Sequence, residues 1–395
     1  MNANETRAAQ WMMGFAERTG LTSDKPGRRY LWTDAFAVCN FLGLARATGK
    51  MAYEELALRL VDRVHNELGR HREDEPRGGW LSGLPDAEAR AHPTRGGLRI
   101  GKALPERRAN EPFDPELEWE RDGQYFHYLT QWMHALDQVT RYTGEPRFNL
   151  WARELAVIAH RRFVHGPPGA RRMFWKMSID LSRALLPSMG QHDPLDGFVA
   201  CSQLEATASA LPTASGPDLR AAIADFAQMI DRDRLATTDP LGLGGILVDA
   251  CRLAQVETNS ELVPRLLDAA AGSLRIYSSQ PDLRARAEHR LAFRELGLSL
   301  GLAGIATEQG ALAFHVDAQR RGQDSLAELL QSVPLRTEIE SFWLDPPHRR
   351  ASTWLEHLDI NEVMLATSLA PEGFVELPAI HRDAMAEKRR PWAST

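Results

Sequence analysis

Residues 122–163 carry the clearest pattern of apolar and polar positions in the chain, and this pattern predicts two helices joined by a tight turn. The first helix would start at Asp122, a good N-cap residue, and would run to about Tyr142. Gly144 follows where a left-handed residue ends a helix, and Pro146 falls where a helix tolerates a missing N–H. Apolar residues recur at helical spacing on the first helix, at Tyr125, Leu129, Trp132, Leu136 and Val139.

A second stripe of the same predicted helix is polar but uncharged. It consists of His127, Gln131, His134 and Gln138. A helix face in contact with water usually carries charged side chains such as Lys and Glu. The stripe therefore indicates a helix that faces a polar interior.

The rest of the chain repeats this helical pattern, with almost no strand-like alternation. Further helices are expected near residues 5–18, 33–49, 51–68, 171–187, 196–211, 217–231, 241–254, 260–277, 286–303, 323–332 and 359–369. Residues 69–121 break the pattern with many Gly, Pro and Arg, and a long loop of this kind is often functional. We expect one all-α domain over residues 1–395, with residues 69–121 as an insertion over its mouth and an irregular tail at residues 376–395.

Six helix starts share a polar cluster, often an Asp beside an aromatic or a His. The clusters are Trp32, Thr33 and Asp34; Glu118, Trp119, Glu120 and Asp122; His192, Asp193 and Asp196; Asp239; Glu288 and His289; and Asp359, Asn361 and Glu362. Asp is a common N-cap, which explains any single cluster. An (α/α)6 toroid explains the whole set, because the N-terminal ends of its six inner helices meet at one rim. An open helical solenoid would have no reason to repeat such clusters.

Composition restricts the class of protein further. The chain has 395 residues, of which 43% are hydrophobic and 25% charged, with a formal charge of −6, so it does not resemble a nucleic-acid binder. Cys39, Cys201 and Cys251 fall within apolar helical patterns and lack metal-ligand spacing, so we expect them to be reduced and buried. With no signal-peptide pattern and no membrane-length apolar run, the expected location is the cytoplasm.

One hairpin of the chain resembles a known group of proteins. Met133, His134, Asp137, Thr143, Gly144, Glu145, Pro146 and Phe148 follow in order a pattern of N-acylglucosamine 2-epimerase-like members of the six-hairpin glycosidase-like superfamily. That superfamily is built on the (α/α)6 toroid, so the resemblance implies this fold and a sugar-processing reaction. Two other epimerase motifs are not matched. Gly190, Gln191, His192 and Asp193 resemble the start of a Gly-His-Asp-x-Glu-Trp motif with Gln191 inserted and the Glu-Trp missing, and a Cys-Pro-Tyr-His segment is absent.

Two sugar chemistries suit residues at the helix starts. Glycoside hydrolysis needs a carboxylic acid and, in inverting enzymes, a second carboxylate roughly 6.5–9.5 Å away. Asp34, Asp122, Asp193, Asp196, Asp359 and Glu362 are the carboxylate candidates. Epimerisation or isomerisation needs bases with a pKa near neutral, which fits His134 and His192, followed by His127 and His289. Because acids outnumber histidines at the helix starts, hydrolysis is preferred, with the epimerase or isomerase reaction and a non-catalytic helical binding protein as alternatives.

The remaining candidates would bind substrate. Trp32, Trp119, Tyr125 and Gln131 would contact a sugar ring, whereas Trp132 falls in the apolar stripe and is expected in the core. Arg95 and Arg99 of the 69–121 segment would point into the mouth and bind the anionic group of a uronate, sugar phosphate or sulfonate. A solvated basic loop is the simpler explanation for the same arginines.

Neither a metal nor a cofactor is expected. His127 and His134 are about 10.5 Å apart along a helix, too far to share one ion easily, and no zinc-binding motif occurs in the sequence. The Asp-rich motifs of terpene cyclases and the Cys and His ligands of lanthionine-cyclase-like toroids are missing as well. The expected partner is a small carbohydrate, neutral or anionic, and the sequence gives no indication of the oligomeric state.

Overall fold

Six helices form a closed inner ring in the computed structural model, which describes residues 2–23, 27–212 and 215–380. They are α2 (Leu31–Thr48), α6 (Phe126–Thr143), α8 (Asp193–Ala210), α10 (Pro240–Val256), α12 (Ala292–Thr307) and α17 (Leu358–Leu369). Each packs against the next, and α17 packs against α2, so the ring closes. The all-α (α/α)6 toroid predicted from the sequence is therefore confirmed.

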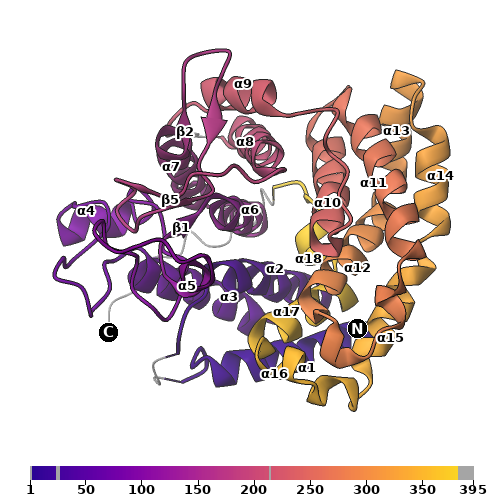
Figure 1. The fold of residues 1–395 in the computed structure, drawn as a ribbon, viewed down its shortest axis with the longest axis horizontal. Coiled ribbons are helices and arrows are strands. Elements are labelled where there is room, and N and C mark those ends of the chain that lie inside the picture. The colour runs from indigo at the N-terminus through magenta and orange to yellow at the C-terminus, as the bar shows by residue number, and fades with distance from the viewer. Residues whose placement is uncertain (1, 24–26, 213–214, 381–395) are drawn as a thin grey trace.

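Outer helices pair with the inner ones and cover the ring. These are α3 (Met51–Leu68), α7 (Pro146–Phe163), α9 (Arg220–Met229), α11 (Leu262–Ser279), α13 (Gln309–Gln319), α14 (Gln323–Gln331) and α15 (Pro334–Leu344). In Figure 1, α11, α13 and α14 form the layer outside α10 and α12. The first helix, α1 (Ala3–Arg18), packs on α17, so the beginning of the chain completes the last hairpin of the ring. No described helix combines the length and the apolar character needed to cross a membrane.

The inner helices are buried on nearly every side, whereas α3 buries only one stripe that includes Leu56, Leu60 and Val64. This difference follows the sequence, because α2 is apolar almost all round and α3 alternates at helical spacing. The short helix α18 (Glu372–Val375) packs against α2, α6 and α10. Its Gly373 lies so close to α2 that a Cβ there would be 2.3 Å from the main-chain oxygen of Cys39.

Several elements differ from those predicted. Residues 171–187 were predicted as a helix but form the short strands β3 (Arg172–Met173), β4 (Lys176–Met177) and β5 (Ala184–Leu186). β4 lies between β1 (Gln124–Tyr125) and β5, antiparallel to both, and β3 pairs with β2 (Val164–His165). Helices α13 and α15 were not predicted. The smaller elements are α4 (Asp86–Ala91), α5 (Pro115–Glu120), α16 (Ser352–Leu355) and the 3-10 turns η1 (Pro281–Arg284), η2 (Ala287–His289) and η3 (His348–Arg350).

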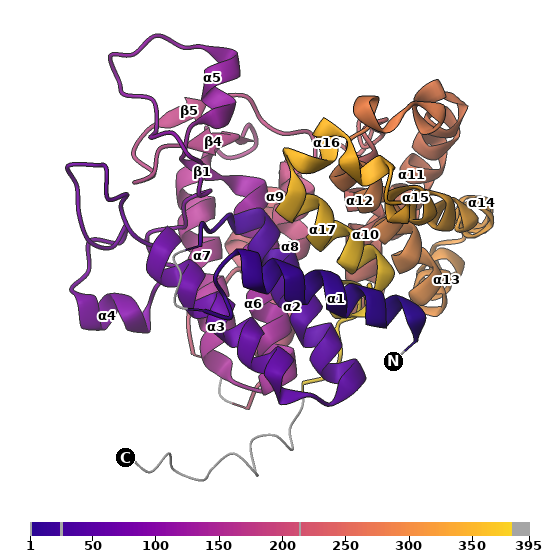
Figure 2. The ribbon, with the colours of Figure 1, turned by 90° about the horizontal axis from the view of Figure 1, so that it is seen from below.

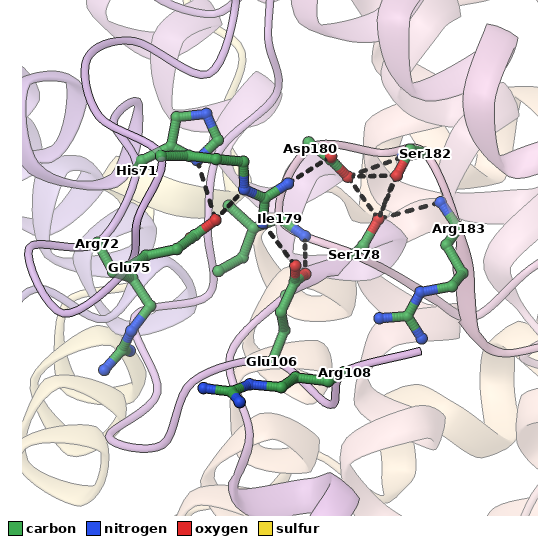
Figure 3. A network of polar contacts seen from close by, with 12 residues as sticks. His71, Arg72, Glu75, Glu106, Arg108, Ser178, Ile179, Asp180, Ser182 and Arg183 are labelled. Carbon is green, nitrogen blue, oxygen red and sulfur yellow. Dashed lines mark hydrogen bonds and ion pairs between the residues drawn. The ribbon is translucent and has the colours of Figure 1, made fainter. Parts of the chain in front are cut away.

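A polar network joins the 69–121 segment to the turn between β4 and β5 (Figure 3). Arg77 forms ion pairs with Glu75, Glu106 and Asp180, and the Glu106 carboxylate also accepts a hydrogen bond from the Ile179 N–H at 2.5 Å. Within the turn, the Asp180 carboxylate accepts hydrogen bonds from both the main chain and the hydroxyl of Ser182. The inserted segment is therefore fastened to the body of the toroid at this turn.

Candidate active site

A cavity of about 850 Å³ opens where the inner helices begin. Five of the six inner helices contribute residues from their starts: Trp32, Thr33 and Asp34 from α2; His127 and Tyr128 from α6; Leu241 from α10; Phe293 from α12; and Leu358, Asp359 and Ile360 from α17. Lys102, Ala103 and Glu120 of the 69–121 segment also line it. Figure 2 shows α5, the small sheet and α16 together at one end of the toroid.

His127 is the histidine of α6 that reaches this cavity, and its side chain is 33% exposed. Its Nδ1 lies 2.7 Å from Oδ2 of Asp196 on α8, and its Nε2 accepts a long hydrogen bond of 3.4 Å from the Trp32 indole N–H. These partners define a neutral imidazole that carries its proton on Nδ1. Burial disfavours the imidazolium, but the Asp196 carboxylate outweighs burial and raises the pKa of His127.

Asp193 and Asp196 begin α8, side by side, and neither is among the residues that line the cavity. Asp193 accepts a hydrogen bond from the Gly190 N–H at 3.0 Å, while burial and the neighbouring Asp196 raise its pKa to about 7. Burial disfavours the Asp196 carboxylate, but His127 more than offsets this, and the pKa of Asp196 lies below its usual value. Asp196 therefore contacts Nδ1 of His127 on the side away from the cavity, and it is not part of the cavity lining.

Asp34 is the buried acid that lines the cavity directly. Its Oδ2 accepts the main-chain N–H of Tyr30 at 3.1 Å, and its Oδ1 lies 3.4 Å from the Arg29 guanidinium. Burial raises the pKa of Asp34 to about 6 in spite of Arg29. A carboxyl group with this pKa can act as an acid near neutral pH.

Aromatic rings form one wall of the cavity. The hydroxyl groups of Tyr30 and Tyr128 are 2.7 Å apart, and both residues line the cavity. Burial raises the pKa of Tyr128 to about 12, so its hydroxyl stays protonated. Tyr125 packs edge-on against Tyr128, and the half-exposed Trp119 packs against Tyr125 in turn. These two predicted sugar-binding residues thus continue the wall outwards without being part of the cavity lining.

The side chain of Arg18 on α1 reaches the start of α17. It forms ion pairs with Asp359, at 2.9 Å, and with Glu362. Arg18 and Asp359 line the cavity, while Glu362 lies behind them and is buried. The guanidinium therefore satisfies two predicted site acids at once.

The structure places the other predicted residues outside the cavity lining. His134 is buried further along α6, and Gln131 is buried on the same helix. His192 donates through Nε2 to the Leu235 main-chain oxygen at 2.8 Å, so it holds the loop after α9. His289 is exposed in η2.

The predicted helix start at Asp122 is wrong, because α6 begins at Phe126. Asp122 is fully buried four residues earlier and pairs with Arg99 at 2.5 Å and Arg72 at 3.3 Å. Its other oxygen accepts the Gly101 and Gly123 N–H groups, so the carboxylate organises the inserted segment.

The expectation that Arg95 or Arg99 points into the mouth is also wrong, since neither lines the cavity. Besides its pair with Asp122, Arg99 donates to main-chain oxygens of Arg70 and Glu67. Arg95 pairs with Glu154 at 2.9 Å on α7. Both guanidinium groups are therefore used to fasten the segment to the toroid.

Several cavity residues were missed in the sequence. Tyr30 precedes the Trp32 cluster and His357 precedes the Asp359 cluster by two residues, so a wider window around each helix start would have found both. Asp249 on α10 also belongs near the site, because its carboxyl group and that of Asp196 influence each other's pKa. Its signal in the sequence was a single acid in a helix whose other residues, apart from Arg252, carry no charge. Across residues 2–23, 27–212 and 215–380, no group of three His, Cys, Asp or Glu side chains could hold a metal.

Comparison with known proteins defines the class by fold. No family model and no curated protein matches the chain. A GH76 alpha-mannanase of Bacteroides thetaiotaomicron is 8% identical and superposes with a TM-score of 0.53 over 94% of this chain and 96% of its own. A sugar epimerase from a ruminal bacterium is 10% identical, with a TM-score of 0.48 over 92% of this chain and 98% of its own. The superposition on the mannanase supports the (α/α)6 fold that the hairpin motif implied.

Proposed function

We propose that this protein is a carbohydrate-active enzyme that removes and returns a proton next to the carbonyl of a sugar, as an aldose–ketose isomerase or an epimerase, with His127 as the base. The observation that carries the proposal is the placement of His127. Its Nδ1 is held by the buried Asp196, and among the described residues its Nε2 makes one hydrogen bond, the long contact with Trp32 at the cavity. A histidine backed by a carboxylate is suited to accept a proton and to be stabilised as imidazolium.

In this reaction Nε2 of His127 would remove the proton from the carbon next to the carbonyl of an open-chain sugar. The electron pair of the broken C–H bond would move to the carbonyl oxygen and give an enediolate. The neutral hydroxyls of Tyr30 and Tyr128 line the same cavity and would donate hydrogen bonds to the sugar oxygens. Return of the proton to the former carbonyl carbon, together with transfer of the hydroxyl proton from one enediolate oxygen to the other, gives isomerisation. Return to the opposite face of the same carbon gives epimerisation and needs a second acid, for which His357 in the lining is the candidate.

A carbohydrate is the preferred substrate class for two reasons. The cavity volume of about 850 Å³ falls in the range of small-molecule sites, and its lining mixes aromatic rings with charged groups. The mannanase whose fold this chain shares is named for its action on a carbohydrate. We further propose that residues 69–121 cover the mouth, because Lys102, Ala103 and Glu120 contribute to the cavity wall.

Glycoside hydrolysis is the second candidate, and Asp34 is the observation in its favour. Asp34 lines the cavity with a pKa raised to about 6 by burial, as a general acid requires. Asp359, Glu120 and Glu356 also line the cavity and could supply the second carboxylate. The pair first expected to do this chemistry, Asp193 and Asp196, lies outside the cavity lining, and for this reason we place hydrolysis second.

An exchange experiment in D₂O separates the two reactions. The parent protein is incubated with a panel of aldoses, ketoses and N-acylated sugars, and deuterium at the carbon next to the carbonyl is followed by NMR. A parallel assay follows release of reducing sugar from glycosides. For the proposed reaction, the parent incorporates deuterium and His127→Gln lowers the rate by about 10²–10⁴-fold. Asp34→Asn should lower this rate less than His127→Gln does. Because the change removes the charge that compensates Arg29, the folding of this variant is checked first.

His289→Gln is the control, since His289 is exposed in η2 and lies outside the cavity lining, so this change should leave the rate nearly unchanged. Release of reducing sugar without deuterium exchange, with Asp34→Asn as the more damaging change, would establish hydrolysis instead. Sugar binding by calorimetry without turnover of any compound would leave the non-catalytic binding protein.

A further inference from the structure

Lys102 is a cation that lines the cavity without a close charged partner. Its side chain is 21% exposed, and the carboxylate beside it, that of Glu120, lies at 3.9 Å and is itself 65% exposed. An ammonium group that is largely removed from water needs a negative charge or hydrogen-bond acceptors close by. Burial lowers the pKa of Lys102, and Glu120 does not fully offset this. The ammonium group is therefore open to a further negative charge.

Arg28 brings a second positive charge to the same part of the cavity. It is exposed and lines the cavity, and its Nε donates to the main-chain oxygen of Gly101, next to Lys102, at 2.9 Å. No carboxylate in the described part of the chain forms an ion pair with its guanidinium. Water can solvate an exposed guanidinium, but two neighbouring cations disfavour each other's charge, and an anion bound to both removes this cost.

The main chain beneath these two cations is held in place. Arg72 donates hydrogen bonds to the main-chain oxygens of Lys102, at 2.8 Å, and of Ala103, at 2.9 Å. The Leu31 N–H donates to the main-chain oxygen of Ile100 at 3.0 Å, which joins the start of α2 to the inserted segment. Both cations therefore extend from segments that are already fastened together, and a site prepared in this way loses less entropy when it binds a ligand.

We propose that Arg28 and Lys102 bind the phosphate group of a sugar phosphate. Because this names the substrate of the isomerase or epimerase reaction, the inference rests on the proposed function. A phosphate monoester carries a charge of about −1.5 to −2 near pH 7, which suits two cations better than the single charge of a carboxylate does. Arginine offers a planar fork of donors to phosphate oxygens, and lysine offers a point charge.

A row of rings leads from this phosphate site to His127. The Lys102 ammonium lies 5.8 Å from the ring centre of Tyr30, and the rings of Tyr30 and Tyr128 are 5.6 Å apart. The rings of Tyr128 and His127 follow at 6.3 Å. A sugar lying along this wall would place its phosphate at Lys102 and its carbonyl end at His127, with the two tyrosine hydroxyls between them.

The other charges near this site make the assignment specific. Arg18 also lines the cavity, but Asp359 and Glu362 already neutralise it. Glu120 is the carboxylate that pairs with Lys102, and it would compete with a bound phosphate. Loss of Glu120 should therefore favour an anionic ligand, whereas loss of Lys102 should disfavour it.

Calorimetric titration of the full-length protein tests this with free hexoses, their terminal phosphates and the matching uronates. Lys102→Gln should weaken binding of the hexose phosphates about tenfold more than that of the free hexoses, because a hydrogen bond between charged groups is lost. Arg28→Gln, at a more exposed position, should have a selective effect of about threefold. Glu120→Gln should strengthen binding of the hexose phosphates by about threefold.

Arg108→Gln is the matched control. Arg108 is an exposed arginine of the same inserted segment, but it lies outside the cavity lining, so its loss should leave every affinity unchanged. Equal losses for phosphorylated and free hexoses in Lys102→Gln would overturn the inference, and so would tighter binding of the uronates than of the phosphates. If Lys102→Gln does not fold, the opposite effects expected of Arg28→Gln and Glu120→Gln decide.

The exchange assay in D₂O, with hexose phosphates added to the panel, separates this inference from the proposed function. A parent that binds hexose phosphates through Lys102 but exchanges no deuterium would remove the proposed reaction and keep the phosphate site. Exchange that depends on His127 and shows no preference for phosphorylated sugars would keep the reaction and overturn the phosphate site.

Discussion

His127 and His134 lie on the same helix, seven residues apart, and belong to the same polar stripe of the sequence. At the mouth, His127 is paired with Asp196 and reaches the cavity. Two turns deeper, His134 is 1% exposed, with Nδ1 near Gln203 and Nε2 donating to the Phe374 main-chain oxygen at 2.9 Å. The two histidines therefore differ in their neighbours in space, although their neighbours in the sequence are much alike.

The nearest charge separates their chemistry. Asp196 raises the pKa of His127, whereas burial, followed by the positive charge of Arg252, lowers that of His134 well below its usual value. His134 thus stays neutral and joins α6 to α8 and α18, while His127 can take up a proton near neutral pH. A histidine in a toroid of this kind is a candidate base only when a carboxylate and a cavity meet at its ring.

The largest expected effect comes from removing that carboxylate. Asp196→Asn removes the negative charge that contacts Nδ1 of His127. The pKa of His127 should fall, and the rate of deuterium exchange should drop by about 10²–10⁴-fold, because the imidazolium loses its stabilising charge. NMR titration and the exchange assay measure both quantities. A parent-like rate in this variant would mean that the Asp196–His127 pair is structural.

Changing the deeper histidine should affect stability and leave the chemistry intact. His134→Leu leaves the buried Phe374 oxygen without its donor and should cost about 1–3 kcal/mol of unfolding free energy in urea. The variant should keep the parent pKa of His127 and, once folded, its rate. A large loss of rate without loss of stability would show that the two ends of α6 are not separate in function.

The smallest expected effect is on the pH dependence of stability. The pKa of Asp193 is raised to about 7 when folded, so between about pH 4 and pH 7 the folded state binds more protons than the unfolded state and stability falls as pH rises. The raised pKa of His127 acts in the same direction, since its contribution is full below about pH 6.5 and is lost as the pH passes its folded value.

Asp193→Asn removes the first contribution. As the pH rises from about 5 to 8, the variant should gain on the order of 2 kcal/mol of unfolding free energy relative to the parent, measured by urea unfolding at each pH. An identical pH profile in parent and variant would show that Asp193 is ionised in the folded protein.

Local physics was enough to find the six inner helices and the rim. Gly144 has the left-handed backbone expected of a C-cap, with φ of 72°, and Pro146 begins α7 as predicted. The six polar clusters do precede or begin the six inner helices, as a toroid requires. Such features depend on residues close in sequence, so a pattern of capping, spacing and apolar periodicity determines them.

Only the tertiary structure decided which polar residues share a site. Asp122 and Asp34 look alike in sequence, yet one is buried by arginines of the inserted segment and the other lines the cavity. The helix predicted at residues 171–187 became strands, because β4 pairs with a strand far away in sequence. His134 contacts Phe374, 240 residues away, whereas His127 contacts Asp196, 69 residues away. Burial and the sign of the nearest charge fix a pKa, and both arise only when distant helices close the ring.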